Sequence, residues 1–402
     1  MISIIPESLS TSELIREKRI RLNMTQKELA DAVGLSKNGD RTIRRWESSE
    51  TSPSKLELSA ILNFPEIAPF RNKSTAKYKQ IDLFAGIGGT RLGFQLTGKT
   101  KSVFSSEIDK FAVKTYKANF GETPHGDITE INEKDIPDHD ILVGGFPCQA
   151  FSQAGKKLGF DDMRGTLFFD VARIIKEKRP KAFLLENVKN LVSHDKGRTF
   201  SLIIDTLEEL NYYVYPALLK ARDFGLPQNR ERIYIVGFDK KQVSNYEDFM
   251  MPIPPKPKTS VGKILEKNVD EKYTISDKLW QGHQRRKLEH QEKGNGFGFS
   301  LVSEKSEYTN TISARYYKDG SEILIEQKGK NPRKITPREA SRLQGFPENF
   351  IIPVSDTQAY KQFGNSVSVP VVNAIAEQII TVLDENPIDN QIKIISKALT
   401  TF

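Results

Sequence analysis

The chain of 402 residues contains a single cysteine, Cys148. One cysteine cannot form an internal disulfide, and the cysteine and histidines do not have the spacing of a zinc site. No apolar run approaches the ~20 residues that cross a bilayer. The N-terminus also lacks the basic and long apolar regions of a secretory signal. We therefore expect a cytoplasmic protein that holds no metal.

Acidic residues are outnumbered by basic ones. The chain has 60 lysines and arginines against 52 aspartates and glutamates, which gives a net charge of +8. A basic excess suits a polyanionic partner such as nucleic acid, although many basic proteins bind none. The composition therefore permits DNA binding, and only the sequence motifs can indicate whether the chain binds DNA.

The first 64 residues have the pattern of short helices. Thr25 is placed as an N-cap, and Glu28 three residues later completes a capping box. Ile43 and Trp46 lie three residues apart, so they face the same side of a later helix. Other residues of that helix project elsewhere: Arg41, Arg44 and Arg45.

This pattern resembles the helix-turn-helix of the Cro/repressor type. The residues that carry the resemblance are Ile15-Arg16, Arg19, Met24-Thr25-Gln26, Glu28-Leu29-Ala30, Gly34-Leu35-Ser36, Ile43 and Trp46-Glu47. The resemblance implies that the arginines of the last helix contact DNA. Residues 37–40 resemble an insertion before that helix. The alternative is a small helical bundle whose arginines only form a solvated face.

A strand, a glycine turn and a helix are predicted in succession at 79–84, 85–89 and 90–96. The strand is apolar enough to be buried in a sheet. A glycine turn between a strand and a helix lets the backbone approach a bound ligand closely. The pattern therefore predicts an α/β domain that binds a ligand at this turn.

Two carboxylates follow the glycine turn. A predicted strand at 102–106 ends in Glu107, where a carboxylate accepts hydrogen bonds from ribose hydroxyls. Asp127 is placed to reach an adenine edge. A nicotinamide enzyme is an alternative, but its G-x-G-x-x-G motif fails because Arg91 occupies the third glycine position. A nucleoside ligand without a diphosphate, such as S-adenosylmethionine, fits better.

The single cysteine lies in GGFPCQAFSQAG, residues 144–155, directly after a predicted strand at 141–145. Ligands of open α/β sheets bind at the carboxyl edge of the strands. Pro147 fixes its own backbone φ and biases Phe146 toward an extended conformation, which would hold Cys148 above the cofactor pocket. A buried structural cysteine is the alternative, and the glycines, the proline and the polar flanks argue against it.

Two more motifs converge on the same edge. A predicted strand at 181–185 leads to Glu186, whose carboxyl is a candidate general acid. The alternative is a glutamate that only caps a helix or forms an ion pair. QNRER, residues 228–232, precedes a predicted strand at 233–237, and its arginines are candidates for contacts with a base or phosphates.

From Lys79 to Leu383 the chain resembles the DNA cytosine-5 methyltransferases, with the motifs in the family's order. These motifs are DLFAGIGG (82–89), SSEID (105–109), GDIT (126–129), GGFPCQAFSQAG (144–155), RGTLF (164–168), ENV (186–188), QNRER (228–232), TPREASRLQGFP (336–347) and QFGNSVSVPV (362–371). The resemblance implies an α/β fold with the Rossmann-like sheet of an S-adenosylmethionine-dependent methyltransferase. It also implies a smaller β-rich target-recognition domain beside the all-α helix-turn-helix domain.

The resemblance assigns roles to individual residues. Cys148 is the implied nucleophile that attacks C6 of a flipped-out cytosine, Glu186 the proton donor at N3, and Arg232 the contact on the O2 side. The implied cofactor contacts are Phe84, Gly86, Gly88, Glu107, Ile108, Asp127, Ile128, Pro147, Leu167, Asn365 and Val367. The implied DNA contacts in the catalytic region are Gln149, Ser152, Arg164 and Arg230.

The target-recognition domain is expected where the sequence pattern changes, after residue 238. Alternating residues over 311–326, with a turn at 318–320, predict a small β-rich unit. Arg315 has the geometry to pair with guanine, and its neighbours Tyr316, Tyr317 and Lys318 are further candidate DNA contacts. The segment resembles that of family members acting on CCWGG, CCNGG and CCGG, which implies a target with CC and GG arms.

The expected domains are the helix-turn-helix at 1–64, a linker at 65–77, the catalytic and cofactor-binding domain at 78–238, the target-recognition domain at 239–332, a return to the catalytic domain at 333–384 and a tail at 385–402. The leading hypothesis is a restriction–modification methyltransferase, paired genetically with an endonuclease, whose N-terminal domain represses its own promoter. A monomer is expected for catalysis, and a dimer on the operator is left open.

Two alternatives remain beside this hypothesis. One is a repressor with an inactive methyltransferase body, against which the intact Cys148 and Glu186 argue. The other is an RNA cytosine-5 methyltransferase, against which the helix-turn-helix and the long recognition region argue. The D/N/S-P-P-Y/F-type motif of adenine-N6 and cytosine-N4 methyltransferases is missing, since Lys256 follows Pro254-Pro255.

Overall fold

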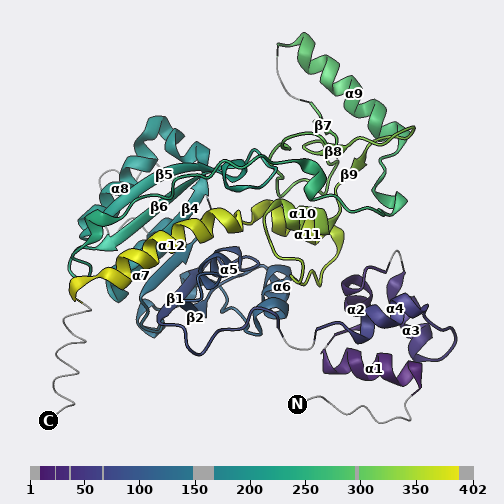
Figure 1. Cartoon of the computed structure of the whole chain (residues 1–402), viewed down its shortest axis with the longest axis horizontal. Coiled ribbons are helices and arrows are strands. Elements are labelled where there is room, and N and C mark those ends of the chain that lie inside the picture. Colours follow the sequence, from purple (N-terminus) through teal and green to yellow (C-terminus); the bar gives the residue numbers. More distant parts are fainter. Residues whose placement is uncertain are drawn as a thin grey trace.

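The computed structural model describes residues 10–22, 24–35, 38–65, 68–147, 167–294 and 298–388. Figure 1 shows a group of N-terminal helices lying beside a larger α/β body, with helix α9 extending away from that body. The body holds the mixed six-stranded sheet that positions the functional site.

The N-terminal helices are α1 (Thr11–Arg21), α2 (Gln26–Ala32), α3 (Gly39–Glu47) and α4 (Lys55–Leu62). They enclose one small core: Ile15, Leu29, Ala30, Ile43, Trp46 and Ile61. The predicted capping box of α2 is confirmed, since the Thr25 side chain accepts from the Glu28 backbone and the Glu28 carboxylate accepts from the Thr25 backbone. Arg19 of α1 pairs with Glu47 of α3, which ties the bundle together.

Helix α3 begins earlier than the sequence suggested. Asn38 is its N-cap in the left-handed conformation, with φ 71°, and the helix starts at Gly39. A Cβ on Gly39 would lie 2.8 Å from the Cβ of Ala30, so α3 packs closely against α2. Gly39 and Asp40 therefore belong to the helix, so residues 37–40 do not all lie before it as expected, while the insertion itself stays a prediction.

The six-stranded sheet has the order β2-β1-β3-β4-β6-β5. Its strands are β1 (Tyr78–Leu83), β2 (Thr100–Ser105), β3 (Ile141–Gly144), β4 (Ala182–Val188), β5 (Tyr212–Lys220) and β6 (Glu231–Asp239). Strands β1 to β4 are parallel, whereas β6 runs antiparallel to both β4 and β5. The start of β6 therefore lies at the same edge as the ends of the parallel strands.

Helices cover both faces of this sheet (Figure 1). They are α5 (Gly89–Gln95), α7 (Leu167–Lys178), α8 (Arg198–Glu209) and α12 (Val369–Glu385). Helix α6 (Lys110–Phe120) packs beside the sheet in a separate cluster with Leu92 of α5. Alternate residues of β3 point to opposite layers. Ile141 and Val143 pack in the cluster with α5 and α12, while Leu142 packs in the cluster with α7 and α8.

Helix α12 is unusually apolar because it lies in the core. Within the described residues, the stretch Asp356–Glu385 that contains it is the one candidate membrane span by length and composition. Its most apolar window is 61% buried inside the protein. The apolar side chains are thus already covered by the sheet, as in the core helix of a globular domain.

The region after β6 contains a second, small sheet and one long helix. The sheet has the order β7-β8-β9 with two residues in each strand: Leu301–Val302, Leu324–Ile325 and Arg333–Lys334. Helix α9 spans Asp277–Glu292. The strand pattern expected over 311–326 is mostly turn, since only Leu324–Ile325 of it pairs as a strand.

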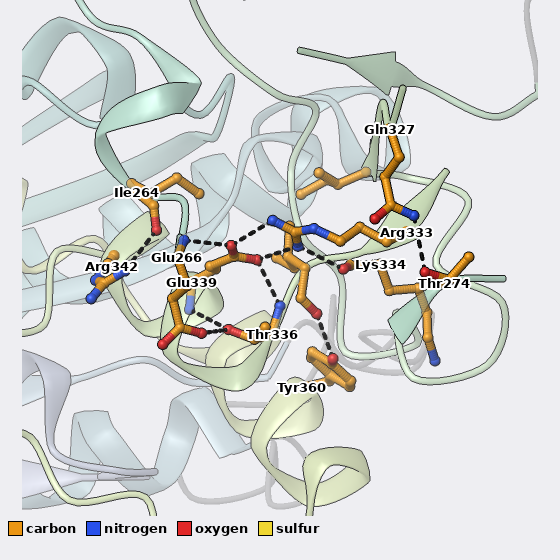
Figure 2. Close-up of polar contacts among 12 residues, drawn as sticks. Ile264, Glu266, Thr274, Gln327, Arg333, Lys334, Thr336, Glu339, Arg342 and Tyr360 are labelled. Carbon is orange, nitrogen blue, oxygen red and sulfur yellow. Dashed lines mark hydrogen bonds and ion pairs between the residues drawn. The ribbon is translucent and has the colours of Figure 1, made fainter. Parts of the chain in front are cut away.

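A buried ion pair fastens this region where it rejoins the body, before α10 (Pro337–Leu343) and α11 (Asp356–Asn365). Figure 2 shows the Glu339 carboxylate facing Arg333 and the backbone of Thr336 and Glu266. Arg333 donates two hydrogen bonds of 2.8 Å to Glu339, and the Thr336 and Glu266 amides donate one each, also at 2.8 Å. Such complete pairing is what makes a buried charge tolerable.

The segment between the N-terminal helices and β1 lies against the body. The ring of Phe70 packs 6.2 Å from Phe120 and 6.1 Å from Phe350. The buried Arg91 donates to the Asn72 side chain at 3.0 Å. This stretch, expected as a linker, is therefore anchored through side chains that belong to the body's own packing.

Candidate active site

The carboxyl edge of the parallel strands opens onto a cavity of about 620 Å³. With the exception of Gly88, the cofactor contacts expected from the sequence line this cavity. They are Phe84, Gly86, Glu107, Ile108, Asp127, Ile128, Pro147, Leu167, Asn365 and Val367. Glu186, Arg230 and Arg232 line the same cavity. Residues from distant parts of the chain thus meet at the sheet edge where α/β proteins bind ligands.

The glycine turn after β1 shapes one wall of the cavity. Gly86 and Gly88 both have positive φ, 54° and 81°, which glycine adopts without strain. Gly88 is the N-cap of α5, and a Cβ there would lie 2.2 Å from the ring of Phe120. Gly88 is therefore packed closely against α6, and its contact with the cofactor stays a prediction.

Glu107 is held by backbone amides on both sides. Its Oε2 accepts from Gly86 N and its Oε1 from Asp109 N, each at 2.7 Å. A carboxylate oxygen has a further lone pair, so both oxygens keep acceptor capacity toward the cavity. This arrangement orients the carboxylate at the place where ribose hydroxyls would need acceptors.

A second group of side chains suits a flat heterocycle. Ile108 lines the cavity with 73% of its surface exposed, which is unusual for a large apolar side chain. Asp127 lies nearby in the same lining, with Oδ1 accepting from Thr129 N at 2.9 Å. Apolar walls with a few fixed polar groups are typical of small-molecule sites. The residues therefore fit the adenosyl part of S-adenosylmethionine.

Glu186 and Arg232 face each other because β4 and β6 are antiparallel. Val188 pairs with Arg232 and Glu186 with Tyr234, and Arg232 Nε lies 3.2 Å from Glu186 Oε1. Glu186 is only 9% exposed. Burial raises the pKa of its carboxyl above the ordinary value, against the opposing pull of Arg232 and Arg230.

The environment of Glu186 suits a proton donor. A raised pKa keeps the carboxyl protonated at higher pH than usual, which is the requirement for a general acid. Its buried Oε1 lies 3.2 Å from Arg232 Nε, but no hydrogen bond of good geometry reaches that atom from the described residues. The carboxyl therefore has hydrogen-bonding capacity left for a group that enters the cavity.

The chain leading to the cysteine is fixed up to Pro147. Asn187 donates from Nδ2 to the Phe146 carbonyl at 2.8 Å, and Phe146 packs against Phe168 at 5.6 Å. Pro147 lines the cavity with Glu186. The remaining predicted residues of this motif and the next lie outside the described residues: Cys148, Gln149, Ser152 and Arg164.

Arg230 does not lie where a DNA contact would require it. Its side chain is 2% exposed, and within the described part of the chain its hydrogen bonds go to backbone carbonyls, to Ser366 O at 2.6 Å, Gly364 O at 3.3 Å and Ile312 O at 3.4 Å. Burial lowers the pKa of its guanidinium to about 10. A side chain with these partners holds segments together, so the expected DNA contact is corrected to an internal role.

The four residues expected to contact the target differ in exposure, because the turn that they form points some side chains outward and one inward. Arg315 and Lys318 are exposed, and Tyr317 is half-buried. Tyr316 has no exposed surface, and its hydroxyl donates to the Ile323 carbonyl at 2.7 Å. Tyr316 therefore cannot touch DNA in this arrangement, and the expectation that it does was wrong.

The arginines of α3 lie on its outer face. Ile43 and Trp46 are buried in the bundle, while Arg41 and Arg44 are exposed. The Arg45 side chain is 54% exposed and lies 3.6 Å from Glu50. The helix therefore presents a basic surface of the kind that DNA-binding helices offer to phosphates and bases.

Sequence reasoning missed the contribution of α11. Gln358, Lys361 and Gln362 line the cavity from this helix. Their spacing of three and four residues places them on one helical face. That spacing was visible directly before the QFGNSVSVPV motif, but its meaning depends on where the helix docks, which local sequence does not reveal.

Comparisons with known proteins agree with this geometry. The family model for the C-5 cytosine-specific DNA methylases matches residues 78–381, and a helix-turn-helix model matches residues 15–69. Type II methyltransferase M1.ScrFI of Lactococcus lactis subsp. cremoris is 79% identical, covering 93% of this chain and 96% of its own. Type II methyltransferase M.SsoII of Shigella sonnei is 72% identical, covering 92% of this chain and 98% of its own.

A solved structure shares the fold. The Entamoeba histolytica methyltransferase EhMeth matches with a TM-score of 0.62 over 77% of this chain and 99% of its own, at 22% sequence identity. At that identity the likeness concerns the fold alone. Together with the family match over 78–381, these findings show that the chain belongs to the C-5 cytosine-specific DNA methylases and carries an N-terminal helix-turn-helix domain.

Proposed function

We propose that the chain methylates C5 of a cytosine flipped out of duplex DNA, with S-adenosylmethionine as methyl donor and Cys148 as transient nucleophile. The observation that carries this proposal is the single cavity in which Glu107, Glu186, Arg232 and Pro147 meet. Part of its lining suits a nucleoside cofactor, and the lining also includes a buried acid next to an arginine. Pro147 is bonded to Cys148, the only thiol of the chain.

The chemistry requires these groups because cytosine C5 is a poor nucleophile. The Cys148 thiolate adds to C6 and forms a C–S bond while Glu186 donates a proton to N3, which leaves an enamine at C5. S-adenosylmethionine, when bound, supplies the methyl group. A solvent water then takes the C5 proton while the C–S bond breaks and its electron pair returns to the Cys148 sulfur. The N3 proton returns to the Glu186 carboxylate, and 5-methylcytosine is released. Arg232 holds the base on its O2 side.

The base has to leave the helix for this reaction. C6 is inaccessible in stacked duplex DNA, and extrusion costs a few kcal/mol, offset by contacts in the pocket. A free thiol has a pKa of about 8.5, so the site must also favour the anion. Arg232 and Arg230 supply positive charge at the cavity wall, which acts in that direction.

We further propose that the enzyme protects host DNA in the cytoplasm as part of a restriction–modification system. The relatives named above are Type II methyltransferases, and an endonuclease acting on the same site is the expected genetic partner. The proposed target has CC and GG arms. Arg315 and Lys318 are its candidate readers, because both side chains are exposed at one turn.

Bisulfite sequencing tests the target. Plasmid DNA from a host that expresses the chain should contain protected cytosines within sites that have CC and GG arms. Arg315→Ala should lower the preference for such sites by about 5- to 150-fold, since one bidentate contact to guanine contributes about 1–3 kcal/mol. Protected cytosines scattered outside CC/GG sites would refute the assignment.

A second activity is proposed for the N-terminal domain, which would bind the promoter of its own operon and repress it. The exposed arginines of α3 favour this role. A chain that starts at Ala68 removes the helices but keeps Phe70 and Asn72 on the body. It should bind promoter DNA about 10³-fold more weakly, the loss of specific binding, while methylation stays within about twofold.

The matched full-length control is Arg41→Ala with Arg44→Ala. Because each phosphate contact contributes about one unit to the salt dependence, the double variant should flatten the slope of log affinity against log salt by about two. Gel-shift titrations at several salt concentrations measure both effects. Promoter binding that is equal in the shortened and the full-length chain would contradict the regulatory role.

A further inference from the structure

The segment that carries the candidate DNA readers packs directly on α11. We call residues 311–318 the recognition segment. A Cβ on Gly364 of α11 would lie 2.3 Å from the carbonyl carbon of Ser313 and 2.4 Å from Ala314 N. Arg230 donates to Ile312 O of the segment and to Gly364 O of the helix. The two backbones are therefore in contact and share one buried guanidinium.

Tyr316 anchors the recognition segment from within. Its side chain is fully buried, and its hydroxyl accepts from Ile335 N at 2.9 Å and donates to Ile323 O at 2.7 Å. Its neighbour Arg315 is exposed. The position of the exposed reader thus depends on a buried residue directly beside it in the chain.

Tyr360 of α11 binds Ile335, whose amide is bonded to Tyr316. Its hydroxyl donates to Ile335 O at 2.5 Å, and its ring meets that of Tyr316 edge to face, with centroids 5.0 Å apart. In Figure 2 the Tyr360 hydroxyl points at the backbone that follows Arg333, the strand residue held by Glu339. Ile335 therefore gives its amide to one tyrosine and its carbonyl to the other.

Helix α11 also lines the cofactor cavity, and Gly364 is part of that lining. Gln358, Lys361 and Gln362 line that cavity, and the side chain of Gln362 accepts from Thr115 Oγ1 at 2.9 Å. Lys361 Nζ also lies 5.2 Å from the ring of Tyr317 in the recognition segment. A single helix thus carries cavity-lining side chains and the contacts that hold the recognition segment.

We propose that Tyr316 and Tyr360 are positioning residues that fix the recognition segment to α11 through the backbone of Ile335, so that target discrimination and cofactor affinity depend on the same two hydroxyls. The inference rests on the proposed function of the segment and of the cavity. Both phenols donate as neutral groups, since burial raises the pKa of each. Both side chains are buried, and neither lines the cavity.

The test compares Tyr360→Phe, Tyr316→Phe and the double variant with a matched control, Tyr212→Phe. Tyr212 is also fully buried and donates to a carbonyl, Pro180 O at 2.7 Å, but it lies in the cluster with α7 and α8. Three quantities are measured: the thermal midpoint, the KM for S-adenosylmethionine, and the ratio of kcat/KM between the cognate duplex and a duplex with one substituted base.

We expect Tyr360→Phe to raise the KM for S-adenosylmethionine and to lower the discrimination ratio, each by about 5- to 10-fold, the size of one buried hydrogen bond. The kcat with both substrates saturating should stay within about twofold. Tyr212→Phe should lower the midpoint similarly and change neither quantity. The double variant should lose less than the product of the single effects, because both hydroxyls act on one backbone group.

Two results would overturn the inference. In the first, Tyr360→Phe and Tyr212→Phe lower the thermal midpoint by similar amounts, and neither variant changes the KM for S-adenosylmethionine or the discrimination ratio. The second is a double variant whose effects are the full product of the singles. Arg315→Ala keeps both hydroxyls and should reduce discrimination alone. Unchanged discrimination in that variant would count against the proposed reading role, whereas the KM measured in the tyrosine variants still tests the coupling.

Discussion

Replacing Cys148 with alanine is expected to abolish methyl transfer, with turnover reduced by at least about 10⁴-fold, as when a catalytic nucleophile is removed. The reason is that C5 of cytosine accepts a methyl group only after a nucleophile has added to C6. Alanine keeps the volume of the site close to that of cysteine but cannot form the bond. The rate is measured as transfer of labelled methyl groups to a duplex with CC and GG arms.

Covalent trapping makes this prediction specific. A duplex with 5-fluorocytosine at the target retains its substituent at C5, so β-elimination is blocked and the adduct accumulates. With S-adenosylmethionine present, the unmodified chain should give a band of raised mass in a denaturing gel, and Cys148→Ala should give none. Because Cys148 is the only cysteine, a trapped thioether has a single candidate site.

Serine at this position provides the complementary control. A hydroxyl is far less ionised than a thiol near neutral pH and is a much weaker nucleophile. Cys148→Ser should therefore bind the duplex and the cofactor but turn over as slowly as the alanine variant. Turnover near that of the unmodified chain in either variant would exclude Cys148 as the nucleophile.

Glu186→Gln is expected to lower kcat by about 10²- to 10⁴-fold, the usual contribution of a general acid. Glutamine keeps the size of the side chain but has no carboxyl proton to give to N3. Burial raises the pKa of Glu186 against the opposing charge of Arg232, which favours the acid form. The KM for S-adenosylmethionine should change by no more than about twofold, because cofactor contacts remain.

Glu231→Gln is the matched control for this substitution. Glu231 precedes Arg232 in β6 and forms an ion pair of 2.8 Å with Lys189, whose side chain is 56% exposed. The same chemical change at this site should leave kcat within about twofold. Equal losses in the two variants would show that charge at the strand end matters and that Glu186 has no special role in proton transfer.

The sheet and the chain order of the motifs were predictable because they follow local rules. Apolar runs at 79–84, 102–106 and 141–145 correspond to β1, β2 and β3, and the Thr25–Glu28 capping box forms as expected. These features depend on residues close together in the sequence. The convergence of Glu107 and Glu186 followed from one further rule, that ligands bind at the carboxyl edge of a parallel sheet.

The errors arose where tertiary packing decides. Arg230 and Tyr316 carry polar groups that local sequence places at the surface, yet both are buried and hydrogen-bonded to backbone from other segments. Helix α9 was missed because its polar sequence has no apolar stripe, and His283 is its one buried residue. Each case depends on contacts between residues far apart in the chain.

The order in which the cavity walls occur along the chain determines when the pocket can form during synthesis. Its walls include Phe84 near the start of the body and Val367 close to its end. A nascent chain therefore cannot form the complete pocket until the C-terminal helices have left the ribosome. Until then the apolar face of the sheet that α12 later covers is exposed to solvent, and exposed apolar surface promotes aggregation. Slow release of the last segment should thus reduce the yield of folded enzyme.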